Sequence, residues 1–566
     1  MRKLNYLGKE LSVTFEETKE SKNLEIAEFG ESNIRSTCII FSVPSWQTNS
    51  LIITRSLEKT VDDFLKMGNY CFLILFISEF ILLGGAGNMI YMIFAASAPR
   101  ISCHGSNFTI ENVCRKYPNL SSLPDCELEI QYEFKSLNVE FEYYCSQGHW
   151  VKSSISVQMG GVMLGTIFFG IMSDRYGRKR CLVIAFIISA ILSIICSYST
   201  SLIYFTAARS ILGFFNGGLL GTYGVYKLEH IPKKHRFWVM TIIAWAPNFI
   251  LLNGIAYLAH DWRTFQRVLV LISSPALVLF FFVHESPRWL IQKGRIEEAR
   301  KVLQRIQQID RQKETKREEM EKMLDVASQK MQAQEEKLKN YTPRHLFYTK
   351  EMAIATIVYC VGLFMVSMVN YGLIFNIESL AGSFFLNSIL IGSIRWAINI
   401  VFAILDYKIK SLGRKIIHLM AQSTIAMCFL VISLTFIFDL DEKYATVIRV
   451  ATITASATSS QMYITKHISG MEFYPTVVRN TAMAFKSTFS RVGTVIAPLL
   501  FLLPWVSVPY VILTFFAAAD AIAFQLLIPE TKGKPLPEDR SANSVQEVLA
   551  SQVMRTDEFR VAHLKK

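Results

Sequence analysis

Among the ionisable residues that interrupt long apolar stretches of the chain, five are candidates for a chemical role: Glu79, Arg395, Lys486, Arg491 and Asp520. At bilayer depth such a residue costs about 2.5 to 3.5 kcal/mol to insert, so it usually faces water or a partner. Arg395 and Arg491 each stand near the middle of a stretch. Because forked guanidinium donors suit carboxylate and sulfate groups, this pair predicts a cavity that attracts anions. Two alternatives stay open: Arg395 pairs with Glu79 or Asp520 as a structural bridge, or one arginine extends to the membrane surface.

The elements that must hold these side chains are twelve apolar segments of about twenty residues, long enough to cross ~30 Å of hydrocarbon. The 566-residue chain is 51% apolar and contains 40 Phe, which is more apolar than a soluble core needs. The predicted spans are residues 70–97, 153–173, 181–199, 202–226, 237–259, 266–283, 352–374, 384–406, 416–438, 443–466, 481–503 and 506–528. They predict an all-α membrane protein with twelve transmembrane helices in two six-helix halves.

The pattern divides the chain into five predicted segments. They are a largely disordered cytoplasmic extension (1–60), an N-terminal six-helix half (61–284) with an extracellular loop (99–149), a cytoplasmic helical loop (285–350), a C-terminal six-helix half (351–530) and a cytoplasmic tail (531–566). The loop 285–350 alternates acidic and basic residues, as solvated helices do.

The net charge of +13 does not indicate a nucleic-acid partner, because the basic residues gather in loops that membrane insertion places in the cytoplasm. Four of them, Lys227, Lys233, Lys234 and Arg236, follow the fourth span. This bias predicts a multi-pass protein with both termini in the cytoplasm, and we expect it in the plasma membrane. The only partners predicted are the lipid bilayer, a small organic ion and a counter-ion or exchanged anion.

The extracellular loop combines four cysteines with two glycosylation sequences. Cys103, Cys114, Cys126 and Cys145 predict two disulfides with three possible pairings. Asn107 and Asn119 each begin an acceptor triplet. The other six cysteines lack the spacing of metal ligands, so no metal is predicted.

Enzyme signatures are absent from the sequence. It has no G-x-x-x-x-G-K-[ST] phosphate loop, no H-E-x-x-H and no G-x-S-x-G. We therefore expect no enzyme activity and no cofactor, and any transport must be driven by a gradient or by exchange.

A short basic loop with paired glycines joins spans two and three, and residues 412–415 echo it in the second half. Acids and basic residues at such span ends could form charge-assisted hydrogen bonds that latch the cytoplasmic ends of the two halves together. The predicted latch residues are Asp174, Arg175, Gly177, Arg178, Lys179, Glu229, Arg236, Glu285, Arg288, Gly413, Arg414, Glu472, Arg479 and Glu530. The second copy departs from the first: Lys410 stands three residues before Gly413, and the nearest acid is Asp406. The second latch is therefore in doubt.

Span four carries a four-residue repeat made of Arg209, Gly213, Gly217 and Gly221. These residues lie along one stripe of a helix, where small side chains let a neighbouring backbone approach closely. The stripe predicts helix packing.

Taken together, the motifs resemble the organic ion transporter family of the major facilitator superfamily, which includes organic cation, organic anion and carnitine transporters. The matching residues run from about 61 to 540 and are the cysteine-bearing loop, Asp174 to Lys179, the stripe from Arg209, Glu229 to Pro232 with Arg236, Asp261 to Arg263, Glu285 to Leu290, Asn370 to Leu373, Glu472 to Asn480 and Pro529 to Gly533. Several blocks also resemble sugar porters; the long loop and Glu472 to Asn480 favour organic ions.

The resemblance implies a major facilitator fold and an alternating-access mechanism. Arg491 matches the anion and carnitine members, whereas the cation members carry an aspartate there. Arg395 stands where members commonly have a carboxylate, and Asn399 replaces a basic residue of the anion members, which weakens any transfer of dicarboxylate exchange. The predicted substrate-binding residues are Arg491, Arg395, Tyr371, Tyr223, Trp245 and Phe364.

These observations predict a secondary active or facilitative transporter of small amphipathic organic anions or zwitterions. A first alternative is an organic cation transporter, which requires Glu79 or Asp520 as the substrate's counter-charge. A second is a transporter-like membrane receptor or scaffold that moves nothing, because Lys410 and Asn399 are departures that a decayed carrier would show.

Overall fold

The computed structural model divides the chain into two compact units, residues 1–63 and 64–566. It describes residues 64–104, 109–110, 113–116, 127–232, 235, 239, 245–311, 315–334, 343–409, 411–474, 476–503 and 505–532, together with four strands between residues 2 and 41.

The strands of the first unit form an antiparallel sheet in the order β1-β2-β3-β4. They are β1 (Arg2–Tyr6), β2 (Lys9–Glu16), β3 (Leu24–Glu31) and β4 (Ile34–Phe41). We expected a largely disordered extension here, and the structure differs. The overlooked signal is in β2, where Leu11, Val13 and Phe15 alternate with polar residues at the period of a strand.

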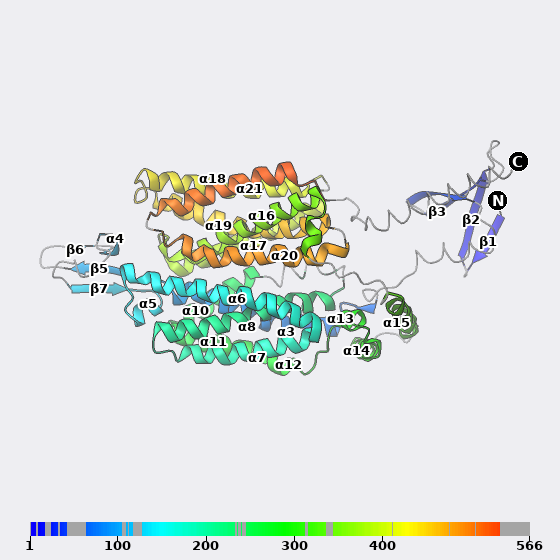
Figure 1. Cartoon of the computed structure of the whole chain (residues 1–566), viewed down its shortest axis with the longest axis horizontal. Helices are drawn as coiled ribbons and strands as arrows, with labels where there is room; N and C mark the ends of the chain where they lie inside the picture. Colours follow the sequence, from blue (N-terminus) through cyan, green and yellow to red (C-terminus); the bar gives the residue numbers. More distant parts are fainter. Residues whose placement is uncertain are drawn as a thin grey trace. The chain divides into compact units, whose positions relative to one another are not determined.

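The second unit contains two helical bundles that lie side by side (Figure 1). The N-terminal bundle consists of α3 (Asn69–Ala95), α6 (Gly148–Tyr176), α7 (Arg178–Ser197), α8 (Leu202–His230), α10 (Trp245–Ala259), α11 (Trp262–Ser273) and α12 (Pro275–Leu279). The predicted span 266–283 is divided because Pro275, which lacks a backbone N–H, starts a new helix.

The C-terminal bundle consists of α16 (Lys350–Ile374), α17 (Phe384–Lys408), α18 (Arg414–Ile437), α19 (Ala445–Phe473), α20 (Thr476–Leu500) and α21 (Ser507–Leu527). Each of the twelve predicted spans therefore overlaps a helix. By length and composition alone, seven described helices could cross a membrane, namely α3, α6, α7, α16, α17, α18 and α21. The others include α8, α19 and α20, which carry buried charged side chains that lower their apolarity.

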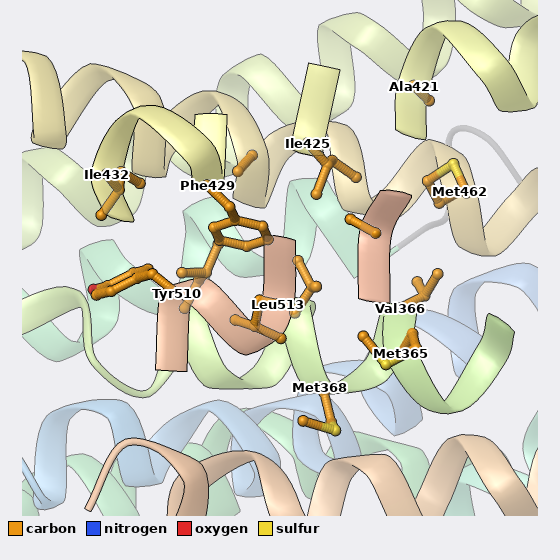
Figure 2. Packing of buried hydrophobic residues seen from close by; sticks show 14 of the residues in the cluster. Met365, Val366, Met368, Ala421, Ile425, Phe429, Ile432, Met462, Tyr510 and Leu513 are labelled. Carbon is orange, nitrogen blue, oxygen red and sulfur yellow. The ribbon is translucent and has the colours of Figure 1, made fainter. Parts of the chain in front are cut away.

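The core of the C-terminal bundle lies between α16, α18, α19 and α21 (Figure 2). Phe429 of α18 reaches toward Leu513 and Tyr510 of α21, and its ring centre is 6.4 Å from that of Tyr510. Met365 and Met368 approach from α16. Across the two bundles, α6 packs against α20 and α10 packs against α17.

The segment between α3 and α6 departs from an all-helical fold. It contains an antiparallel sheet in the order β6-β5-β7, made of β5 (Arg100–His104), β6 (Thr109–Ile110) and β7 (Glu127–Gln131), with the short helices α4 (Val113–Lys116) and α5 (Leu137–Glu140). We call the end of the bundles that carries this sheet the loop end. The opposite end carries α13 (Pro287–Gln292), α14 (Ile296–Ile309) and α15 (Thr315–Gln334), and we call it the α13 end (Figure 1).

Helices α6 and α8 pack with almost no space between their backbones. A Cβ on Gly213 of α8 would strike the Gln158 carbonyl of α6, and a Cβ on Gly217 would strike the Val162 carbonyl. Gly221 is less confined, because its nearest neighbour is Thr166 Cγ2 at 3.4 Å. The glycine stripe thus lies at a helix contact, as its spacing predicts.

We expect Gly217→Ala to destabilise the protein by about 1 to 3 kcal/mol, because the added methyl group forces two packed backbones apart. Thermal unfolding in detergent measures the effect. Gly254→Ala is the matched control, since nothing lies within 4 Å of a Cβ at that position. Equal melting temperatures for the two variants would contradict the prediction.

Arg209, predicted with the same stripe, has an additional role in the N-terminal bundle. Its guanidinium is fully buried and donates to the Gln158 Oε1 (3.1 Å), Gln266 Oε1 (3.2 Å) and Asn88 backbone oxygen (2.6 Å). The Tyr91 ring lies 4.5 Å from the guanidinium carbon. Arg209 therefore ties α3, α6 and α11 to α8 through neutral partners.

Candidate functional site

A cavity of about 360 Å³ lies between the two bundles. Its walls come from α3, α8 and α10 on one side and from α16, α17, α19 and α20 on the other. The lining residues are Leu82, Leu220, Tyr223, Gly224, Lys227, Trp245, Ala246, Val366, Ser367, Asn370, Tyr371, Arg395, Asn399, Ser459, Ser460, Tyr463, Ile464, Ser490 and Arg491. Five of the six predicted substrate-binding residues are among them.

Arg395 projects from α17 and is only 4% exposed. Its Nη2 donates to Asn370 Oδ1 at 2.7 Å and to the Ser456 carbonyl at 2.8 Å, while its Nε has no hydrogen-bond partner. Within the described part of the chain, Arg395 forms no ion pair. The proposed bridge to Glu79 or Asp520 is therefore not seen, and the guanidinium keeps its charge and a donor for a ligand.

Arg491 lies on α20 and is partly exposed to the cavity. The Tyr371 hydroxyl of α16 lies beside its guanidinium. No carboxylate of the described residues pairs with Arg491 either. The two arginines thus bring two uncompensated positive charges to the same wall.

Lys227 adds a third positive group from the opposite bundle. It is 3% exposed, and its Nζ donates to the Tyr223 hydroxyl at 2.8 Å. We expected Lys227 in the basic loop after span four, which is wrong because α8 continues to His230. The signal was available in the sequence: Tyr223 and Lys227 are four residues apart and therefore share a helix face.

The cavity also has aromatic and hydroxyl-bearing walls. Tyr223, Trp245 and Tyr371 line it as predicted residues, and Tyr463 was overlooked. Phe364 does not line the cavity. Its backbone carbonyl packs where a Cβ on Gly493 would stand, and its side chain packs against the core cluster.

Small polar residues complete the wall on the side of the C-terminal bundle. Ser459 donates to Asn370 at 3.2 Å, and Ser460 donates to Asn399 at 2.9 Å. Asn399, which departs from the family pattern, thus lines the cavity as a hydrogen-bonding group without a charge. In the described residues, no group of three or more His, Cys, Asp and Glu side chains could hold a metal ion.

The family model for the sugar (and other) transporter family matches residues 127–540. The chain belongs to this family. It is a multi-pass membrane transporter of the major facilitator superfamily and not an enzyme, as the motifs predict.

The transporter has relatives that match most of its length. A Drosophila melanogaster protein named "Organic cation transporter protein" is 28% identical over 449 residues, which cover 78% of this chain and 80% of the relative. Solute carrier family 22 member 7 of Bos taurus is 28% identical over 416 residues, covering 72% and 73%. The human protein of that name is 26% identical over 408 residues, covering 70% and 71%.

Solved structures of the same fold include the proton:xylose symporter XylE bound to 6-bromo-6-deoxy-D-glucose. It superposes with a TM-score of 0.57 at 17% identity and covers 82% of this chain and 98% of its own. The inward open conformation of the xylose transporter XylE from E. coli gives 0.57 at 16% identity, covering 82% and 98%. These likenesses establish the major facilitator fold of the transporter.

At the α13 end of the transporter, a carboxylate caps a helix in each bundle. Glu285 accepts hydrogen bonds from the backbone N–H groups of Arg178 (2.9 Å) and Lys179 (3.0 Å), which begin α7. Gly177 precedes them with φ +115°, and a Cβ there would strike Glu285. A glycine is therefore needed where the basic loop turns.

Side chains extend this cluster within the N-terminal bundle. The Arg178 guanidinium contacts Asp174 and lies 3.4 Å from Glu229 Oε1. Arg175 is exposed in the last turn of α6, and Arg288 is half-buried in α13. Arg236, also predicted as a latch residue, lies outside the described residues.

The C-terminal bundle has an equivalent cluster despite its different sequence. Glu530 accepts from the N–H groups of Arg414 (2.9 Å) and Lys415 (3.0 Å), and a Cβ on Gly413 would strike it. The Arg414 guanidinium lies 2.7 Å from Asp406 and 3.1 Å from Glu472. Asp406 thus supplies the acid that the second basic loop lacks.

These contacts differ from the predicted latch in one respect. Each partner named above lies in the same bundle as the residue that it binds, and Arg479 donates to the Tyr474 carbonyl within its own bundle at 3.1 Å. In this conformation, the described residues of the clusters stabilise each bundle separately. A latch between the two halves stays a prediction for another conformation.

Contacts between the bundles are found at the loop end instead. Lys152 of α6 lies 2.9 Å from Glu378 Oε1 and donates to Asn376 Oδ1 at 2.8 Å. Glu133 accepts from the Ser383 hydroxyl at 2.8 Å and from the Phe384 N–H at 3.3 Å. The described structure therefore has the bundles bridged at this end.

Disulfide bonding in the loop is confirmed for Cys114 and Cys145, which are joined. Cys103 is also disulfide-bonded, and its partner is not among the described residues. Cys126 and the predicted glycosylation sites Asn107 and Asn119 lie outside the described residues.

We expect Glu530→Gln to lower the melting temperature at neutral pH. Burial alone would raise the pKa of Glu530, but the N–H donors of Lys532, Lys415 and Arg414 more than offset it and hold the pKa below its usual value. The lowered pKa means that the carboxylate stabilises the fold above its unfolded value of about 4.3 and loses this contribution as the pH falls through its folded value. In thermal unfolding in detergent, the difference in melting temperature between the variant and the wild type should become smaller as the pH falls through that range.

Glu318→Gln, on the exposed surface of α15, is the control for the loss of one carboxylate. Its melting temperature should follow that of the wild type at every pH. A Glu530→Gln difference that stays constant from neutral to acidic pH would exclude the charge of Glu530 as the cause.

Proposed function

We propose that this transporter moves small amphipathic organic anions across the plasma membrane by alternating access, with the loop end outside and both termini in the cytoplasm. The observation that carries the proposal is the charge of the cavity. Arg395, Arg491 and Lys227 line it, and none of its described lining residues is Asp or Glu. The charge of Lys227 interacts with that of Glu79, which lies outside the lining, so the two arginines carry most of the argument. Coulomb attraction in a cavity lined by charge of one sign and walled by protein favours a negatively charged passenger.

The remaining groups suit an amphipathic anion. Aromatic rings would contact the apolar part of the passenger, and serine and asparagine side chains would fix its orientation. The two arginines present forked donors, so a carboxylate or sulfonate would bind between them. A counter-ion or an exchanged anion would balance the movement of charge.

An organic cation is the second candidate, because the Drosophila melanogaster relative carries that name. It requires a carboxylate that can reach the passenger. Asp520 is bound to Lys466 inside the C-terminal bundle, with 2.7 Å between Nζ and Oδ1. Glu79 accepts from Asn248 at 2.7 Å and has one buried oxygen without a hydrogen-bond partner, so it is the candidate counter-charge. Neither acid lines the cavity.

Uptake into proteoliposomes decides between these candidates. Radiolabelled hippurate supplies an aromatic carboxylate, and radiolabelled tetraethylammonium supplies a permanent cation. We expect saturable uptake of hippurate above that of protein-free vesicles and no uptake of tetraethylammonium. The reverse result would assign the chain to cation transport, and binding of either probe without uptake would favour a receptor.

A further inference from the structure

A second group of ionisable side chains lies inside the C-terminal bundle, away from the cavity. Lys466 of α19, Asp520 of α21 and His418 of α18 are 0%, 5% and 0% exposed. Lys466 Nζ lies 2.7 Å from Asp520 Oδ1, and His418 Nε2 lies 3.4 Å from Asp520 Oδ2. The imidazole stacks on Phe524 with a centroid distance of 3.8 Å. One carboxylate therefore holds two basic groups in place.

Lys486 of α20 is the fourth member of this group, which we call the buried cluster. It is 1% exposed, its Nζ donates to the Lys466 carbonyl at 3.1 Å, and the Tyr359 ring centre lies 5.2 Å away. Within the described residues, no carboxylate lies within ion-pair distance of Lys486. Its amine thus has polar neighbours but no counter-charge.

Glycines in two helices leave room for these amino groups. A Cβ on Gly362 of α16 would strike the Lys466 Nζ, and a Cβ on Gly470 of α19 would strike the Lys486 Nζ. The absence of a side chain at both positions lets each amine sit against helix backbone. The packing of α16 and α19 therefore accommodates both buried amino groups, so neither lysine is there only to fill a gap in the core.

The geometry of the buried cluster does not fix how many protons its basic groups carry. Lys466 and Asp520 cancel when both are charged, so a further positive charge on Lys486 or His418 gives the buried cluster a net charge in a dry interior. Among the described residues, the other titratable groups facing it are Tyr359 and Cys360 of α16 and His467 of α19, and none of them is a carboxylate. A buried amine of this kind can gain a proton from water on one side and lose it on the other.

The buried cluster is connected to the cavity by three helices. On α20, Lys486 precedes Arg491, and on α19, Lys466 follows Tyr463. On α16, Gly362 precedes Tyr371. A change of charge in the buried cluster alters the packing of helices that also line the cavity, which is the kind of differential contact that alternation needs.

We propose that the buried cluster is a proton-binding site that couples movement of the passenger to movement of a proton. The neutral Lys486 amine accepts one proton to become an ammonium, and it releases the same proton to the opposite side when the bundles change their packing. Lys466, Asp520 and His418 position and tune that amine. This inference rests on the proposed function in one respect: with an anionic passenger, the proton cancels its charge, so proton and anion move in the same direction.

The test uses the whole transporter in proteoliposomes and two assays. In exchange, labelled hippurate enters against unlabelled hippurate inside, at equal pH on both sides. In net uptake, the vesicles hold no hippurate and the outside is one pH unit more acidic. Because one unit is worth about 1.4 kcal/mol per proton, coupling of one proton per passenger predicts about tenfold accumulation. A pH-sensitive dye inside should report acidification beyond that in protein-free vesicles when hippurate is added.

Lys486→Met should retain exchange and lose both the tenfold accumulation and the dye signal. His418→Gln, which keeps a polar side chain of similar size, should weaken the same two readouts. The control is Lys443→Met, which removes an exposed lysine at the loop end and should match the wild type. If Lys486→Met does not fold, the wild-type dye signal and His418→Gln carry the test.

Four outcomes separate the two proposals. Wild-type exchange without gradient-driven accumulation or dye signal would overturn the proton site and leave anion transport standing. Full gradient response in Lys486→Met would overturn the assignment of that amine. If hippurate does not exchange, anion transport fails, and the two assays are repeated with tetraethylammonium and the opposite pH gradient. The absence of a gradient effect there would overturn proton coupling as well.

Discussion

Arg491→Asp is expected to reduce hippurate uptake by about a hundredfold or more. Removing one member of a hydrogen-bonded charge pair costs about 2 to 5 kcal/mol, and the new carboxylate adds repulsion of the passenger. The loss should appear in proteoliposomes as uptake equal to that of protein-free vesicles. The fold should tolerate the change, because Arg491 is partly exposed and no described carboxylate depends on it.

The control for this reversal is Arg317→Asp on the exposed surface of α15, far along the chain from the cavity. Both variants should reach the membrane in wild-type amounts, measured by surface labelling in cells. Arg395 is a poorer position for reversal, because its bonds to Asn370 and Ser456 also hold three helices together. Unchanged hippurate uptake by Arg491→Asp at normal surface abundance would contradict the proposed function.

The same variant also tests the cation alternative. A carboxylate in place of Arg491 leaves Arg395 and Lys227 as the positive charges of the cavity and adds a negative one, so the net charge of the lining falls by two. If the wild type already takes up tetraethylammonium and Arg491→Asp does not change that uptake, Arg395 and Arg491 do not select the passenger by its charge.

The fold could be predicted because each crossing of the bilayer requires an apolar helix of about twenty residues, which is visible in the sequence. Twelve apolar segments of membrane length allow few other arrangements, and paired basic loops divide them into two halves. Pro275 explains why the predicted span 266–283 is divided into two helices. The strands between residues 2 and 41 could not be predicted from hydropathy, because this segment mixes charged and polar residues with apolar ones and the alternation in β2 is short.

The charged residues of the cavity and of the buried cluster could be predicted only where a charge interrupts an apolar stretch. Arg395 and Arg491 satisfy that condition. Lys227 and Lys466 do not, because each stands at the predicted end of a span, where a lysine is ordinarily a cytoplasmic or interfacial residue. Their helices continue to His230 and Phe473, and helix length is a property that hydropathy alone does not determine.

Contacts that depend on loop geometry could not be predicted. Asp406 and Arg414 are eight residues apart and end up 2.7 Å apart because the chain reverses between α17 and α18. The first loop achieves the same with Asp174 and Arg178 four residues apart on either side of one glycine. Two different spacings thus give the same cluster, so the departure at Lys410 was a misleading signal.

Arg209→Ala is expected to have the largest effect on folding. The guanidinium donates hydrogen bonds to Gln158 Oε1 and Gln266 Oε1, and no other described group donates to either oxygen. Each buried acceptor left unsatisfied costs about 1 to 3 kcal/mol, and the cavity left by the side chain adds to this. Against a typical net stability of about 5 to 15 kcal/mol, we expect little folded protein, measured as monodisperse yield after detergent extraction.

A comparison with two other substitutions tests the reason for this loss. Arg209→Lys keeps the positive charge but not the fork, so it should recover only part of the yield. Arg267→Ala removes an arginine from α11 that donates to the Ser197 hydroxyl near the loop end, and it should be tolerated. If Arg209→Ala and Arg267→Ala give equal yields, the buried amide network does not stabilise the bundle. Because Asn88 retains donors from Gln266 and Ser193, the loss is assigned to the two glutamines.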